Sequence, residues 1–187
     1  MTNASAGQNP ILTEMFRHNL WANLTLIDFC ATLPDEILET NVPGTFGTIR
    51  ETLGHLAGTE EGYLAGLVGD IAPDSSSAEE VSPSLAALRE RALQVGEVLA
   101  LATVREHAVK SGEEPIAYAE AVEGNPTARV AWFGQTYEIP SSLFLVQAIN
   151  HATEHRAQIK TALTQAGIPP PELDGWTWDR EKSGQSR

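Results

Sequence analysis

The sequence predicts an all-α protein, a four-helix bundle with a short β-hairpin before its last long helix. Four segments carry apolar residues at three- and four-residue spacing over about 20–28 residues each, which is typical of amphipathic helices that pack on one another. Only residues 128–133 and 136–139 have the appearance of short strands. The 187 residues are enough for one domain with a sizeable core.

The first two helices have clear starting signals. Residues 9–33 open with an asparagine N-cap followed by proline in the first turn. Residues 48–68 open with a capping box, in which Thr48 and Glu51 satisfy each other's backbone amides. Residues 69–82 are rich in Ser, Asp and Pro, and we expect them to form a mobile loop.

The third helix is predicted at residues 83–109, again opened by a serine cap and a proline. Residues 111–127 are predicted to be irregular. In the hairpin that follows, Gly134 and Gln135 suit a two-residue turn with glycine first. Connections of this length can cross a bundle, so a strict up-down-up-down topology is not implied.

The last helix is predicted at residues 141–166, capped by Ser141 or Ser142 and stopped by Gly167 and three prolines. The expected domain organisation around these helices has three parts. We expect a disordered N-terminus at residues 1–9, one bundle domain at residues 10–178 and a flexible tail at residues 179–187. Two tryptophans should dock the start of the C-terminal segment on the domain, namely Trp176 and Trp178.

Composition limits the function classes. The net charge of −13 argues against binding nucleic acid or an anionic membrane surface. The sequence contains neither a signal peptide nor an uncharged apolar stretch of 18 residues, so we expect no membrane insertion. The single cysteine, Cys30, fits a reducing compartment, and we therefore expect a cytoplasmic protein.

His151 and His155 are the most informative residues of the last helix. They lie four residues apart and therefore project from one helix face, on an otherwise apolar stripe. The spacing equals that of the zinc-protease motif His-Glu-x-x-His, but Ala152 replaces the general-base glutamate, which excludes a protease. From spacing alone, a metal pair and two hydrogen-bonded or exposed histidines remain equally open.

A third ligand would have to come from another helix. His55 is the best candidate because small residues surround it on the second helix, whereas His18 and His107 fit structural or surface roles better. Glu154 flanks the histidine pair on the last helix, where it could orient a ligand or simply be solvated. The role of Glu60 is open, since it lies about 140° around the helix from His55.

Three segments together resemble the DinB family. Residues 145–159 are similar to its "nH-x-x-x-HR-x-Q-I" segment, and residues 55–64 to its histidine-bearing second helix. Residues 18–23, His-Asn-Leu-Trp-Ala-Asn, resemble its first helix. The hairpin and the closing Leu-Asp-Gly-Trp at residues 173–176 also fit, so the resemblance covers about residues 10–178.

The resemblance implies a DinB-type four-helix bundle in which His55, His151 and His155 hold a divalent metal ion, such as Zn, Ni or Fe. It also implies a homodimer. The residues expected around the metal or in the pocket beside it are Glu154, Arg156, Asn23 and Trp21. This chain has Glu154 where many relatives have histidine, and Ala157 where many have glycine; neither is a proposed ligand.

The implied function is a thiol-dependent S-transferase, or a related metal-dependent hydrolase or isomerase, acting on a small molecule with a low-molecular-weight thiol. Three imidazoles and an open position are typical of a catalytic metal, which would lower the pKa of a bound water or thiol at neutral pH. The alternative is a non-catalytic binding or stress-response module that the metal only stabilises.

Overall fold

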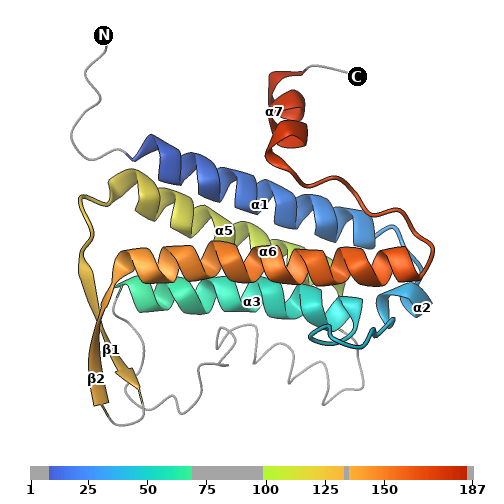
Figure 1. The fold of residues 1–187 in the computed structure, drawn as a ribbon, viewed down its shortest axis with the longest axis horizontal. Coiled ribbons are helices and arrows are strands. Elements are labelled where there is room, and N and C mark those ends of the chain that lie inside the picture. Colours follow the sequence, from blue (N-terminus) through green and yellow to red (C-terminus); the bar gives the residue numbers. More distant parts are fainter. Residues whose placement is uncertain (1–8, 69–98, 133–134, 185–187) are drawn as a thin grey trace.

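The bundle predicted from the sequence is confirmed. The computed structural model describes residues 9–68, 99–132 and 135–184 (Figure 1). Within these ranges, four long helices pack side by side: α1 (Pro10–Cys30), α3 (Ile49–Val68), α5 (Leu101–Ala121) and α6 (Ser141–Gln165). Among the described residues, no helix combines the length and the apolar character needed to cross a membrane.

The helix directions place α3 beside α6. Helices α1 and α6 run in one direction, and α3 and α5 run in the other (Figure 1). Helix α1 packs on α5, and α3 packs on both α5 and α6. Ion pairs from Arg105 to Asp28 (2.6 Å) and from Arg17 to Glu120 (2.7 Å) join α1 and α5 in this antiparallel arrangement. The two helices that carry the predicted metal ligands are therefore antiparallel neighbours.

The first two long helices begin as their capping residues predict. The Asn9 Oδ1 atom accepts a hydrogen bond from the Leu12 amide at 3.1 Å. The Thr48 hydroxyl accepts from the Glu51 amide at 3.1 Å, and the Glu51 carboxylate accepts from the Thr48 amide at 2.9 Å. Each pair satisfies backbone amides that the first helical turn leaves without an intrahelical partner.

Helix α6 is capped differently from the prediction. Neither Ser141 nor Ser142 is the N-cap; that position belongs to Pro140, which has no capping side chain. Instead, the Asn125 Oδ1 atom accepts from the Ser142 amide at 3.0 Å. Because Asn125 precedes the hairpin, the cap depends on the hairpin bringing distant residues together, which a local sequence pattern does not reveal.

The third helix, predicted at residues 83–109, is confirmed over residues 101–109. Residues 83–98 of the prediction lie outside the described part, and residues 99–100 are not helical. Helix α5 continues to Ala121, so the irregular segment predicted at residues 111–127 was wrong over its first eleven residues. The reason is a set of buried residues through which α5 packs among its neighbours α1 and α3: Ala108, Ser111, Gly112, Pro115 and Ala119.

Gly112 and Pro115 therefore pack inside a helix and do not form a turn. A Cβ atom on Gly112 would lie 2.5 Å from Cδ1 of Leu20, so the glycine allows α1 to approach α5 closely. Pro115 lies inside the helix and is buried. An interior proline costs a helix about 3 kcal/mol, and tertiary packing of the kind seen here can offset that cost.

The hairpin is confirmed to within about one residue at each strand end. Strand β1 (Thr127–Trp132) pairs antiparallel with β2 (Gln135–Pro140), and Trp132 lies opposite Gln135. Gln135 is thus a strand residue and not a turn residue as predicted, while Gly134 lies outside the described residues. The backbone amide of Ser141 donates to the carbonyl of Pro126 at 2.8 Å, which ties the start of α6 to the base of the hairpin.

Two short helices were not predicted, α2 (Asp35–Leu38) and α7 (Gly175–Ser183). The Trp178 ring of α7 packs edge-on to His18 of α1 with 5.5 Å between ring centroids, as expected for a docking residue. Trp176 does not dock, because 80% of it is exposed. The expected domain boundary after residue 178 falls inside α7, whose last turns occupy the start of the predicted tail.

The core consists of two apolar clusters with buried polar residues between them. The larger contains Leu26, Leu53 and Ile159, and the smaller contains Phe16, Phe144 and Ala148. On α1, α3 and α6, four polar residues are buried at the level between these clusters: Asn19, Asn23, Glu60 and Arg156.

Candidate metal centre

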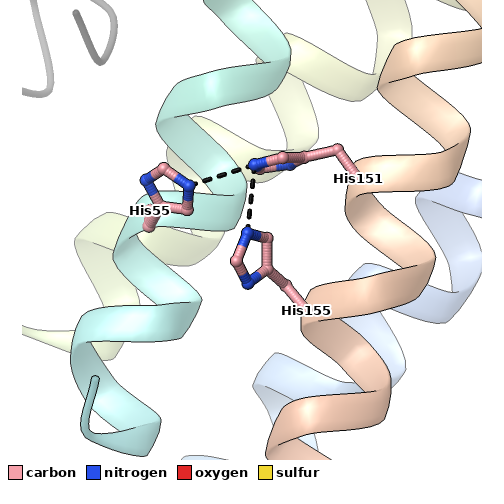
Figure 2. Close-up of side chains that lie close together, drawn as sticks. All are labelled: His55, His151 and His155. Carbon is pink, nitrogen blue, oxygen red and sulfur yellow. Dashed lines mark hydrogen bonds between the residues drawn. The ribbon is translucent and has the colours of Figure 1, made fainter. Parts of the chain in front are cut away.

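The structure brings together the three histidines predicted from the sequence (Figure 2). His55 projects from α3, and His151 and His155 project from successive turns of α6. The Nε2 atom of His151 lies 3.0 Å from Nε2 of His55 and 3.0 Å from Nε2 of His155. His155 is buried, whereas His55 and His151 are partly exposed, so the cluster lies where a small molecule can reach it.

The tautomer of His155 follows from its neighbour. Its Nδ1 atom lies 2.9 Å from the Oε1 atom of Gln158. A carbonyl oxygen only accepts hydrogen bonds, so the Nδ1 atom carries the proton and donates it. The Nε2 atom of a neutral His155 therefore presents its lone pair to the other two histidines.

Thr59 contacts His55 from the next turn of α3. The Thr59 hydroxyl donates to the backbone carbonyl of His55 at 2.7 Å. Its oxygen lies 3.4 Å from Nδ1 and 3.5 Å from Nε2 of His55, so this contact does not choose between the two tautomers of the ring. A proton on Nδ1 would leave the Nε2 lone pair of His55 directed toward the cluster.

His151 lies between the Nε2 atoms of these two rings. Burial, followed by the neighbouring His155 and His55, lowers the pKa of His151 from 6.5 to about 4, so the ring is neutral at physiological pH. Its Nδ1 atom is buried and has no hydrogen-bond partner among the described residues. The single N–H of a neutral ring cannot satisfy both neighbours, whereas a divalent cation accepts three imidazole lone pairs at once. The cluster could therefore hold a divalent metal ion.

Two aromatic rings border the histidines. Phe46, in the connection between α2 and α3, stacks on His55 with 3.9 Å between ring centroids and 15° between ring planes. Tyr63 lies edge-on to His151 at 5.6 Å. Sequence reasoning assigned no role to Phe46, because a residue in an irregular connection carries no periodic signal. Gln158 did carry a signal, as the glutamine of the "HR-x-Q-I" segment.

Two of the residues expected near the metal have hydrogen-bond partners outside the histidine cluster. Glu154 is exposed and accepts a hydrogen bond from Asn150 at 3.2 Å. The indole N–H of Trp21 donates to Glu181 of α7 at 3.0 Å. The structure therefore places Glu154 on the outer face of α6, and places Trp21 at the contact between α1 and α7.

Asn23 and Arg156 belong to a buried polar network behind the histidines. The Nη1 atom of Arg156 donates to the side-chain oxygens of Asn19 and Asn23, both at 2.6 Å. The amide nitrogens of these asparagines donate to one oxygen of Glu60, at 2.6 and 2.8 Å. The network joins α1 to α3 and α6, the helices that carry the histidines. It also gives Glu60 the role that the sequence left open.

Burial opposes the charges in this network. It raises the pKa of Glu60, although the asparagine hydrogen bonds and Arg156 counteract this effect. It lowers the pKa of Arg156 to about 10, against the attraction of Glu60. The two asparagines bridge the charged groups: their side-chain oxygens accept from the guanidinium, and their side-chain nitrogens donate to the carboxylate. Removing one member would leave a buried charge without its partner, which is strongly destabilising in proteins.

The fold and the site define a helical-bundle protein with a candidate three-histidine metal centre. Residues 1–185 match the DinB family. The chain is also similar to Protein DinB of Bacillus subtilis (strain 168), with 22% identity over 169 residues, covering 86% of this chain and 89% of that protein. The chain belongs to the DinB family.

Proposed function

We propose that the chain is a metal-dependent enzyme that transfers a low-molecular-weight thiol to an electrophilic small molecule. A divalent ion, zinc, nickel or iron, would be held by His55, His151 and His155. Imidazole nitrogens suit all three metals. Hydrolysis or isomerisation at the same site is the related chemistry.

The observation that carries this proposal is the convergence of three histidine Nε2 atoms at a partly exposed position. The Nε2 atoms of His55 and His155 each lie 3.0 Å from Nε2 of His151. Three protein ligands leave a fourth position of a tetrahedral ion open, which is the usual arrangement of catalytic and not of structural zinc. Phe46 and Tyr63 add aromatic surface beside His55 and His151.

The chain's residues contribute orientation and a neutral ligand set. Gln158 holds His155 with its Nε2 lone pair inward, and burial keeps His151 unprotonated. A divalent ion bound there would act as a Lewis acid that lowers the pKa of a nearby thiol or water. In the transfer, the thiol loses its proton and its sulfur bonds to the electrophilic carbon. The leaving group departs with the electrons of its bond and takes up a proton.

Elemental analysis of the purified protein tests the metal site. We expect one divalent ion per chain in the wild type and loss of the ion in His151→Ala. His18→Ala is the matched control, because His18 lies on α1, bonded to the carbonyl of Leu173. Absence of metal from the wild type, or retention of metal by His151→Ala, would contradict the proposal.

A turnover assay on the same samples tests the chemistry. We expect the metal-loaded wild type to join a low-molecular-weight thiol to an electrophilic aryl halide, and the chelated protein to lose this activity. If neither a thiol transfer nor a hydrolytic substrate is turned over while chelation lowers the melting temperature, the metal is a stabilising component of a non-catalytic module.

A further inference from the structure

A single side-chain oxygen connects the histidine cluster to the loop before α3. The Gln158 Oε1 atom lies 3.1 Å from the backbone nitrogen of Phe46, which donates to it, and 2.9 Å from Nδ1 of His155. Both partners therefore use the same acceptor. Phe46 in turn stacks on His55 and lies edge-on to His155, with 5.5 Å between those ring centroids.

The Phe46 amide fixes the chemistry of this junction. A backbone N–H is always a donor, so the Gln158 atom that faces it is the carbonyl oxygen and not the amide nitrogen. That oxygen has two lone pairs, one for each partner. The second partner, His155, must then donate from Nδ1, which leaves its Nε2 lone pair available to a metal.

The loop that carries Phe46 is held together by its own hydrogen bonds. The Thr45 hydroxyl lies 2.7 Å from the carbonyl of Val42 and 3.1 Å from the carbonyl of Gly47. Asn41 and Thr48 form an isolated β-bridge that closes the loop. The side chain of Val42 is buried in the larger apolar cluster. These contacts join the residues of the loop to one another and to the core.

We propose that Gln158 is a positioning residue that couples metal binding at the three histidines to the position of the loop at residues 41–47. The coupling rests on the proposed function, since it requires the histidines to bind a metal. Binding of the metal needs the Nδ1–H tautomer of His155, and that tautomer holds the Gln158 oxygen where the Phe46 amide reaches it. Metal binding and loop ordering are thermodynamically linked. Ordering of the loop therefore raises the metal affinity by the same factor by which bound metal favours the ordered loop.

Zinc titrations of three variants test this role. Gln158→Met keeps the length of the side chain and removes the acceptor, and we expect its zinc affinity to fall by about 10–100-fold. Gln158→Glu offers an oxygen to each donor, and we expect it to bind zinc at least as tightly as the wild type. Gln165→Met is the matched control, because Gln165 is exposed at the end of the same helix.

Two spectroscopic measurements separate positioning from a merely structural effect. In the metal-free protein, ¹⁵N chemical shifts should report the Nδ1–H tautomer of His155 in the wild type and in Gln158→Glu, and its loss in Gln158→Met. Hydrogen exchange at the Phe46 amide should slow when zinc is added to the wild type, and should not respond to zinc in Gln158→Met.

The outcomes distinguish this inference from the proposed function. If the wild type does not bind zinc, both are overturned. If the wild type binds zinc and Gln158→Met binds it equally well, or if exchange at the Phe46 amide is the same with and without zinc, the coupling is overturned while the metal site stands.

Discussion

Each histidine of the cluster is held by a different contact. His155 is buried and bonded to Gln158, His55 lies between Thr59 and the Phe46 ring, and His151 contacts the other two through Nε2. Among the described residues, the central ring, His151, makes no hydrogen bond outside the cluster. Burial also lowers its pKa to about 4, so protonation of His151 has a direct effect on stability.

We expect the metal-free protein to lose stability through His151 as the pH falls from about 6.5 to about 4. The unfolded chain binds a proton near the ordinary pKa of 6.5, whereas the folded chain binds it only near 4. The contribution of neutral His151 to the free energy of unfolding is thus complete above pH 6.5, and it is lost as the pH decreases through this window. Urea unfolding in the presence of a chelator, for the wild type and His151→Asn, measures this effect.

The difference between the two proteins isolates His151. The raised pKa of Glu60 acts with the opposite sign, because the unfolded chain releases this proton at a lower pH than the folded chain does, so stability falls as the pH rises. Glu60 is present in both proteins, so its contribution largely cancels. Parallel pH profiles for wild type and variant would contradict the assignment to His151.

The sequence predicted the three histidines because two follow helical periodicity and the third lies among small residues. It did not predict the positions of Glu154 and Trp21, which depend on the rotation of each helix and on the docking of α7. It also missed Phe46, whose approach to His55 depends on a loop with no repeating pattern. Contacts within one helix were thus predictable, and contacts between elements were predictable only in part.

Among the elements, α5 shows how a turn-like composition can belong to a helix. Its Ser-Gly-Glu-Glu-Pro stretch, residues 111–115, contains the residues that usually mark a break. In the bundle, Ser111, Gly112 and Pro115 are buried, and Gly112 lies against Leu20 of α1. Whether a glycine marks a turn or a close helix contact depends on the partner helix, which the local sequence does not contain.

We predict that Gly112→Ala destabilises the protein by about 1–3 kcal/mol, although alanine is the better helix former. The added Cβ atom would lie 2.5 Å from Cδ1, 3.2 Å from Cγ and 3.3 Å from Cβ of Leu20, so the whole Leu20 side chain must move. Gly54→Ala in α3 is the matched control, because its Cβ would meet Leu99 at an ordinary 3.5 Å. Thermal and urea unfolding compare them, and equal stabilities would refute the packing role.

At the scale of the whole molecule, four of the exposed apolar residues in the described part lie at one end, whereas Phe46 and Trp176 lie elsewhere. Ile11 and Met15 belong to the first two turns of α1, and Leu143 and Val146 to the first two turns of α6. Both helices begin at the end of the bundle that carries the hairpin (Figure 1). We propose that these side chains form the interface of a homodimer, the assembly expected from the family resemblance.

Charged substitutions at this end should dissociate the proposed dimer. We expect Val146→Glu and Ile11→Glu to convert it to a monomer in sedimentation velocity, because burying an unpaired carboxylate in an apolar contact is costly. Ala102→Glu provides the control, since Ala102 is exposed on α5, away from the four residues. A wild-type monomer at micromolar concentration would refute the interface.

The buried asparagines of α1 have a consequence for how the bundle assembles. Asn19 and Asn23 are one turn apart, and both bond to Arg156 and Glu60. If α1 slid by one turn, about 5.4 Å, Asn23 could replace Asn19, but Ile27 would then face the guanidinium and the carboxylate. A slide the other way would put Met15 there. The asparagine pair thus fixes the sliding register of α1, which apolar clusters alone specify weakly.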